Sequence, residues 1–314
     1  KNCLFAFKHR GFWQCMDTMR DKELLDKSKQ IWILKKKVLI IGGTGFLGVN
    51  LILAIRKKFQ NFKIISVSRK KTPFLRNSKN FKSIYADLSK KSLLIKKFKN
   101  HNFDIVINLG GNIQHKNKFD TNRSHFKLCK NLVDYFENKI ELFIQIGSSM
   151  EYGTQNYPNK ETDKCRPKSI YGKSKLKSSN YIKKSKLRYL ILRLYQVYGP
   201  YQKINRLVPS SIFNLLRNKE FNSSSGQQLR DFMYVDDFTN LIVKILKDKK
   251  PQVGIYNVGT GVPVSIKKVL KKIRSLIITG DIKYGSIKMR KDEIKILYPN
   301  IKKIKKILKW RPVT

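Results

Sequence analysis

From residue 35 onward, short apolar runs alternate with longer stretches in which apolar residues recur every three or four positions. The short runs have the length and the Ile and Val content of buried β-strands. The longer stretches predict amphipathic helices, because their spacing places apolar side chains on one helix face. The predicted strands are residues 35–43, 63–70, 81–88, 103–111, 141–149 and 188–199.

Predicted helices separate these strands, which indicates an α/β fold with a doubly wound parallel sheet, because strands joined through helices pair in parallel. After Gly199 the alternation breaks into loops and helices. Residues 200–226 and 261–314 are expected to form a small mixed C-terminal lobe, while 227–260 return to the domain of residues 35–199. The helices that alternate with the strands are 46–59, 92–100, 122–138 and 169–185.

Residues 1–34 do not share this pattern. We interpret them as an N-terminal extension of unknown role or as upstream sequence, with Met19 as an alternative start. The four cysteines form neither a CxxC pair nor a cluster with histidine, so free thiols in a reducing cytoplasm and no metal site are expected. Neither a membrane span nor a secretory signal is visible in the sequence. The cysteines are Cys3, Cys15, Cys129 and Cys165.

Basic residues dominate the charge. The chain has 68 Lys and Arg against 21 Asp and Glu, a formal net charge of +47. These residues are spread along nearly the whole chain, together with abundant Ile and Asn, so we attribute the excess to a compositional bias rather than to nucleic-acid binding. The positive field still favours anionic substrates such as phosphates.

A glycine-rich loop joins the first strand to the first helix, in the stretch IGGTGFLG. Glycines at this junction permit a tight turn and a close approach of the backbone to a ligand. The N–H groups and dipole of the helix N-terminus can then hold a pyrophosphate. In this context the loop predicts a dinucleotide site, and an ordinary Gly-rich turn is the weaker interpretation. The predicted contact residues are Gly42, Thr44, Gly45, Phe46, Leu47 and Gly48.

The end of the second strand distinguishes NAD from NADP. An acidic residue there binds the 2′-hydroxyl of NAD, whereas an arginine accommodates the 2′-phosphate of NADP. The sequence has no acid at this point and reads Ser68, Arg69, Lys70 and Lys71. NADP is therefore the preferred cofactor, with NAD as the alternative.

Tyr171 and Lys175 are four positions apart on a predicted helix, so their side chains share one face. A free tyrosine has a pKa near 10, too high for a base at neutral pH. A neighbouring ammonium and a positively charged nicotinamide ring both favour the phenolate. The spacing therefore allows both side chains to reach one ligand.

Several short motifs follow one another in a fixed order. They are GGTGFLG, ADL (86–88), NLGG (108–111), IGSSMEYG (146–153), YGKSK (171–175), LRLYQVYGP (192–200), RDFMYVDD (230–237), YNVGTG (256–261) and LKWRP (308–312). Over roughly residues 36–314 the chain therefore resembles the extended short-chain dehydrogenase/reductase family, in particular its NAD(P)-dependent nucleotide-sugar epimerase/dehydratase branch. That resemblance implies dinucleotide binding by the Rossmann domain of 35–199 and substrate binding by the C-terminal lobe.

The resemblance also implies roles for single residues. Tyr171 would be the acid/base, Lys175 would bind the nicotinamide ribose, and Ser148 would hold the substrate oxygen, with Ser149 as its neighbour. Asp87 and Leu88 would contact the adenine. The turn that follows the fourth strand would line the cofactor, with glycines where most relatives have alanine; it comprises Leu109, Gly110 and Gly111.

On the substrate side, Arg230 and Arg290 match family arginines that bind the nucleotide diphosphate, a task suited to a bidentate guanidinium. Arg206 lies in the loop that closes over the nucleotide in relatives. Gln196 takes a position near the substrate that is often Asn. For each arginine, a solvated surface cation is the alternative.

The reaction subtype depends on the two positions after Ser148. Related 4,6-dehydratases carry an acidic pair there, whereas this chain has Ser149 and Met150, and Glu151 follows one place too late. We therefore expect 4-keto reduction or C4 epimerisation of a nucleotide-diphosphate sugar for surface polysaccharide, with 4,6-dehydration as the alternative. A homodimer is compatible with the family. The rival hypotheses are a non-catalytic dinucleotide-binding protein, recruited to RNA, and a degenerate or truncated gene product.

Overall fold

The structure is a computed structural model that describes residue 19 and residues 35–112, 117–154, 157–289 and 293–314. The chain divides into two compact units, Lys1–Lys35 and Lys36–Thr314. All elements below belong to the second unit. The predicted extension 1–34 lies outside the described residues, apart from Met19.

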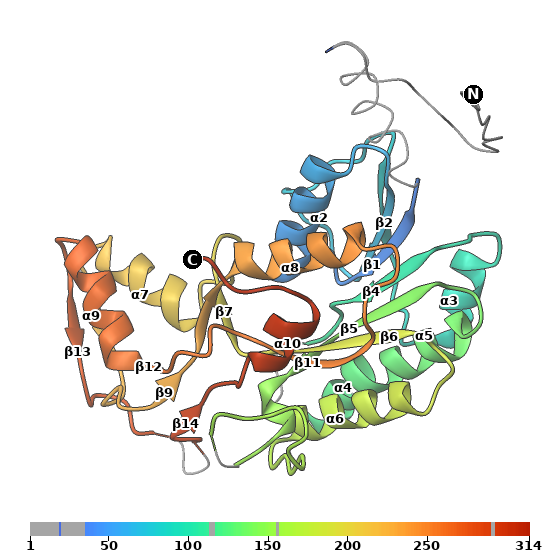
Figure 1. Cartoon of the computed structure of the whole chain (residues 1–314). Coiled ribbons are helices and arrows are strands. Elements are labelled where there is room, and N and C mark those ends of the chain that lie inside the picture. The colour runs from blue at the N-terminus through green and yellow to red at the C-terminus, as the bar shows by residue number, and fades with distance from the viewer. Residues whose placement is uncertain (1–18, 20–34, 113–116, 155–156, 290–292) are drawn as a thin grey trace, which may run out of the picture. The chain divides into compact units, whose positions relative to one another are not determined.

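A seven-stranded parallel sheet forms the centre of this unit (Figure 1). Its order is β11-β6-β5-β4-β1-β2-β3, and each neighbouring pair is parallel. The predicted doubly wound Rossmann fold is confirmed. The strands are β1 (Lys37–Ile41), β2 (Lys63–Ser68), β3 (Phe81–Tyr85), β4 (Ile105–Asn108), β5 (Leu142–Ser148), β6 (Tyr189–Leu194) and β11 (Gly254–Val258).

Helices cover both faces of the sheet, which is why its strands are continuous apolar runs rather than alternating ones. On β1, Val38 and Ile40 join the core under α2 and α8, while Leu39 and Ile41 join the core under α3 and α5. Figure 1 shows these two helical layers on opposite sides of the sheet. The helices are α2 (Phe46–Lys58), α3 (Lys91–Phe98), α4 (Lys118–Asn122), α5 (Leu128–Phe136), α6 (Ile170–Lys183), α8 (Val235–Lys247) and α10 (Lys302–Ile307).

Two predicted elements differ from the structure. The expected helix 122–138 contains a π-helical turn, η1 (Arg123–Lys127), between α4 and α5. The expected strand 188–199 divides after β6, because the chain changes its hydrogen-bonding partner. The backbone N–H of Tyr195 still donates to Val258, whereas that of Gln196 donates to Asp231.

The second piece of the divided strand, β7, pairs in parallel with β10. A separate group of elements packs around Leu215, Leu270 and Ile282, in the region predicted to be the C-terminal lobe. In Figure 1, α7, α9 and β13 lie together at the far left. These elements are β7 (Gln196–Tyr198), β10 (Phe232–Tyr234), α7 (Leu207–Leu215), β8 (Glu220–Asn222), β9 (Leu229–Arg230), β12 (Val264–Ser265), α9 (Ile266–Leu276), β13 (Asp281–Lys283) and β14 (Ile296–Leu297).

Candidate active site

The strand order reverses between β1 and β4, and sheets of this kind bind ligands outside the carboxyl ends of the strands at such a point. We call this region the crevice. Loops from both strands meet there. A Cβ added to Gly42 would come within 3.0 Å of the backbone of Leu109 and Gly110. The glycine loop after β1 and the predicted cofactor turn after β4 are therefore in direct contact.

The glycine loop is shaped to bring a ligand close to the backbone. Gly42 has a φ of 82°, and a Cβ on Gly48 would lie 2.4 Å from the carbonyl oxygen of Gly42. Larger residues at either position would force the loop open. Gly45 is the N-cap of α2, where no side chain caps the first turn and no acid lies within it. N–H groups at a helix N-terminus of this kind are suited to binding an anion such as a pyrophosphate.

The ends of β2 and β3 extend the same edge. The Oγ atom of Ser68 accepts a hydrogen bond from the backbone N–H of Thr44 at 3.1 Å, and Arg69 beside it is exposed. Asp87 follows β3, and its carboxylate lies 3.7 Å from the guanidinium of Arg123. Leu88 is buried beneath it. The predicted ribose and adenine residues therefore gather on neighbouring strand ends.

Local charges and burial change the pKa of Asp87 in opposite directions. Burial raises the pKa of this carboxyl, but hydrogen bonds from Ser89 and the charges of Arg123 and Arg69 outweigh it. The pKa of Asp87 is consequently lowered, and the group is an anion at neutral pH.

The predicted acid/base pair lies on α6, with Ser169 as its N-cap. The Nζ atom of Lys175 is buried and donates to the carbonyl of Ile146 at 2.7 Å, two residues before Ser148 on β5. It also lies 5.9 Å from the centre of the Tyr171 ring. Lysine and tyrosine thus share one helix face beside the end of β5, as their spacing predicted.

Close packing holds α6 against the turn that follows Ser148. A Cβ on Gly172 would lie 2.4 Å from the carbonyl oxygen of Met150. The Oγ atom of Ser148 accepts a hydrogen bond from the backbone N–H of Met150 at 3.2 Å. A hydroxyl that accepts in this way keeps its own proton to donate to another oxygen. Ser149, the neighbouring candidate, is buried in the short 3-10 helix η2 (Ser149–Glu151).

Glu151 points away from the crevice. Its carboxylate is fully buried and forms an ion pair with Arg193 of β6 at 3.1 Å. Burial lowers the pKa of Arg193, but Glu151, Tyr152 and Cys165 together outweigh this effect and keep the pKa above its ordinary value. The carboxylate of Glu151 therefore lies in the protein interior, where it is paired with Arg193.

His125 contacts both the cofactor turn and Tyr171. It lies in η1, and its ring meets the ring of Tyr171 edge to face with 5.1 Å between centroids. Its Nε2 atom is 3.3 Å from the backbone nitrogen of Asn112. Sequence reasoning missed His125 and considered Glu151 only as a carboxylate one place too late for a dehydratase, because nothing in the local pattern showed which way either side chain points.

The predicted substrate residues are spread over several elements of the structure. Gln196 is half-buried on β7. Arg230 forms an ion pair with Glu293 and donates to the carbonyl of Leu229 at 2.8 Å. Burial lowers the pKa of Arg230, and the charge of Glu293 opposes this. Arg290 lies outside the described residues.

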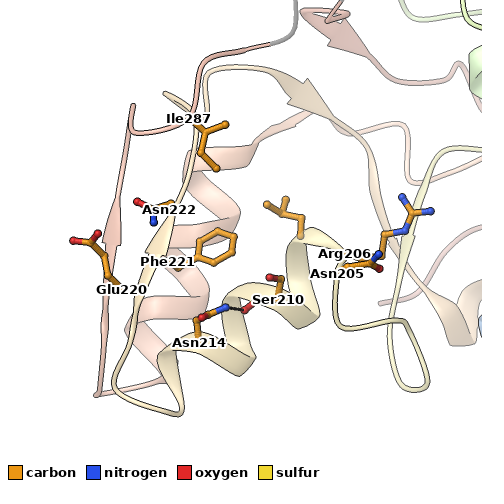
Figure 2. Close-up of a pocket in the computed structure, with 9 residues that line it drawn as sticks. Asn205, Arg206, Ser210, Asn214, Glu220, Phe221, Asn222 and Ile287 are labelled. Carbon is orange, nitrogen blue, oxygen red and sulfur yellow. Dashed lines mark hydrogen bonds between the residues drawn. The ribbon is translucent and has the colours of Figure 1, made fainter. Parts of the chain in front are cut away.

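Arg206 lies at a cavity of about 400 Å³ in the C-terminal lobe. Figure 2 shows its guanidinium at one end and Phe221, Asn222 and Glu220 toward the other, with Ser210 of α7 between Arg206 and Phe221. Ser148, Tyr171 and Lys175 do not line this cavity. The structure thus separates a lobe cavity from the strand-end crevice. The lining residues are Asn205, Arg206, Leu207, Ser210, Asn214, Glu220, Phe221, Asn222 and Ile287.

Among the described residues, no three His, Cys, Asp or Glu side chains are grouped so that they could hold a metal ion. In the same part of the chain, no helix is both long and apolar enough to cross a bilayer.

A family model described as "NAD dependent epimerase/dehydratase family" matches residues 38–259. The chain belongs to this family. The matched range includes the glycine loop, the end of β5 and the Tyr171–Lys175 face. The predicted resemblance to nucleotide-sugar epimerases and dehydratases is confirmed.

Individual relatives differ in the reaction that their names state. The dTDP-D-glucose 4,6-dehydratase of Dictyostelium discoideum is 30% identical over 281 residues, which cover 77% of this chain and 62% of that enzyme. This chain therefore spans less than two thirds of that relative. The CDP-abequose synthase of Salmonella typhimurium is 26% identical over 299 residues, covering 89% of this chain and 94% of the synthase.

Solved structures share the fold. The UDP-glucuronic acid 4-epimerase from Bacillus cereus, in complex with UDP-glucuronic acid and NAD, superposes with a TM-score of 0.79 at 24% identity. The match covers 88% of this chain and 94% of the epimerase. At this identity the likeness establishes the architecture and leaves the substrate undecided.

Proposed function

We propose that this protein is an NAD(P)-dependent enzyme that reduces a 4-keto group or epimerises C4 of a nucleotide-diphosphate sugar, for surface-polysaccharide synthesis. The observation that carries the proposal is the packing of the Tyr171–Lys175 face of α6 beside the end of β5 that bears Ser148, at the same edge of the sheet as the glycine loop. A protein that only binds dinucleotides has no need for this arrangement. Nucleotide sugars and reduced thiols make the cytoplasm its expected location, and a homodimer remains compatible with the family.

Each residue has a defined task in this proposal. Tyr171 exchanges a proton with the oxygen at C4 of the sugar. Ser148 donates a hydrogen bond to that oxygen, since its Oγ atom already accepts from Met150. Lys175 has three N–H donors, of which one serves Ile146, so the others can reach the nicotinamide ribose and the phenol. Bound NAD(P) supplies the hydride donor or acceptor.

The glycine loop and the strand ends fit such a cofactor. The uncapped α2 N-terminus would hold the pyrophosphate, Asp87 and Leu88 the adenine, and Gly110 and Gly111 the nicotinamide half. We propose NADP as the preferred form, because the end of β2 offers Ser68 and Arg69 instead of a carboxylate that would repel a 2′-phosphate. The Bacillus cereus epimerase binds NAD, so NAD is the alternative.

Reduction or epimerisation is favoured over dehydration because the crevice lacks the acidic pair. Met150 has no group that can move a proton, and Glu151 is bound to Arg193 in the interior. Dehydration remains the second candidate, since the Dictyostelium relative is a 4,6-dehydratase and is the more similar of the two relatives by identity.

The lobe of residues 200–226 and 261–314 would bind the nucleotide. Its cavity of about 400 Å³ combines the cation of Arg206 with the ring of Phe221, which suits a phosphate and a base. Arg230 could join only by exchanging Glu293 for a phosphate, because the two side chains are paired.

The test is a substrate panel. Purified protein is incubated with the oxidised or the reduced form of NADP or NAD and with UDP-, dTDP-, CDP- and GDP-linked sugars, including 4-keto-6-deoxy sugars, and the products are identified by NMR. Oxidation of the nicotinamide with a keto-sugar indicates a reductase. Formation of a C4 isomer without net oxidation indicates an epimerase, and a 4-keto-6-deoxy product from a plain sugar indicates the dehydratase. Cofactor binding without turnover of any sugar would overturn the proposed catalysis.

A further inference from the structure

Glu151 connects three elements of the candidate active site through one carboxylate. Its Oε1 atom accepts a hydrogen bond from the backbone N–H of Ser148 at 2.9 Å. Its Oε2 atom accepts from the hydroxyl of Ser179 at 2.8 Å and from Nε of Arg193 at 3.1 Å. The residue is 0% exposed, so solvent does not compete for these contacts.

The partner on α6 is on the same helix face as the predicted acid/base pair. Ser179 follows Lys175 by four residues and Tyr171 by eight, and side chains at this spacing share a helix face. The contact between Ser179 and Glu151 therefore ties the Tyr171–Lys175 face to the carboxylate. The contact between Ser148 and the same carboxylate ties the end of β5 to it.

The surroundings of Glu151 leave it little freedom. A Cβ on Gly147 would lie 2.7 Å from Oε1 of Glu151, so the strand has a glycine where the carboxylate passes. Arg193 is held in turn by the ring of Tyr152, with its guanidinium 4.5 Å from the ring centre. The carboxylate thus has one defined position between β5, α6 and β6.

We propose that Glu151 is a positioning residue that sets Ser148 against Tyr171 and Lys175, without touching substrate or cofactor. This inference rests on the proposed function, in which Ser148 and Tyr171 bind the same substrate oxygen. Two hydrogen-bonding groups on one atom must keep a fixed separation. A shift of about 1 Å in such a site lowers turnover about 100-fold.

Two variants test the inference: Glu151→Gln disturbs all three contacts of the carboxylate, and Ser179→Ala disturbs only one of them. Glu151→Gln removes the charge that pairs with Arg193 and places an amide N–H toward a donor. Ser179→Ala removes only the link to α6 and changes no charge, so its folding is secure even if Glu151→Gln misfolds. Expected values of kcat fall about 10- to 100-fold for Glu151→Gln and by a smaller factor for Ser179→Ala, while KM and cofactor affinity stay near wild type.

Two matched controls separate positioning from stability. Asp237 is also fully buried and accepts a backbone N–H of Val313, and Thr239 is a buried helix threonine that donates to the carbonyl of Asp236. Asp237→Asn and Thr239→Val should lower the melting temperature to a similar degree yet keep kcat. If they lower kcat as much as the matched test variants, Glu151 has only a structural role.

Hydrogen–deuterium exchange of the segment around Ser148 gives a readout that needs no substrate. The wild-type protein should protect the Ser148 amide, and both test variants should lose that protection, together with protection at the Ser179 turn. A wild-type protein that turns over no sugar would end the proposed function, while exchange would still decide the inference. Unchanged exchange in both variants would overturn it.

Discussion

The imidazole of His125 occupies the space that a side chain on Gly111 would fill. A Cβ added at residue 111 would come within 2.3 Å of Cε1 of His125. The same ring contacts Tyr171 edge to face. The family resemblance implies alanine at this position in most relatives. Glycine is required here because the π-helical turn η1 places the ring of His125 where an alanine methyl group would lie.

Gly111→Ala should destabilise the protein by about 1–3 kcal/mol, because the new methyl group overpacks the site. His125→Ala should remove this penalty, so the double variant should be more stable than the sum of the single effects predicts. Denaturant unfolding of the four proteins measures the coupling. Strict additivity would show that the ring and residue 111 do not compete for space.

Tyr171→Phe should lower kcat/KM about 10²- to 10⁴-fold, the contribution typical of a general acid or base. Cofactor affinity should stay close to wild type, since only the hydroxyl is lost. Turnover of the sugar identified in the panel measures the effect. Tyr135→Phe, on α5 and packed against the core, is the control and should keep its activity. Full activity of Tyr171→Phe would remove the proposed acid/base.

Arg69→Ala should weaken NADP binding about 10- to 100-fold, the equivalent of one hydrogen bond to a charged group. NAD binding should change little, because NAD lacks the 2′-phosphate. Titration of both cofactors measures the two affinities. Lys82→Ala removes an exposed cation from the start of β3 and controls for the general field. Tighter binding of NAD than of NADP by the wild-type protein would contradict the preference.

Cys129 should resist alkylation in the native protein. Burial raises the pKa of its thiol to about 12, so the reactive thiolate is absent at pH 8.5. Mass spectrometry after iodoacetamide treatment should find residue 129 modified only in denaturant. Labelling of native protein at the rate of a free thiol would contradict the buried position.

The raised pKa of the Cys129 thiol also makes the free energy of unfolding depend on pH. Because the pKa of Cys129 is raised in the folded state, its contribution is complete below the ordinary thiol pKa of about 8.5 and is lost as the pH rises above it. Cys129→Ala should therefore lose less stability than wild type between pH 7 and pH 10, as measured by thermal unfolding. An equal loss in both proteins would show that other groups cause the change.

Much of the fold follows from short-range patterns. Apolar runs of strand length, the glycines between β1 and α2, and the four-residue spacing of Tyr171 and Lys175 were sufficient to predict the doubly wound sheet and the shared helix face. Each of these signals acts within a few residues, through backbone geometry and burial of one face, so it survives in any context that lets the elements form.

Other features depended on contacts between distant parts of the chain. Glu151 turns inward because Arg193 and Ser179, 42 and 28 residues away, offer it partners. Arg230 is paired because Glu293 returns beside it from the C-terminal lobe. The sequence determined which chemical groups are available, and the tertiary structure decided which of them face the crevice. The physical reason is that a buried charge takes the orientation in which it is paired, and no local pattern encodes that partner.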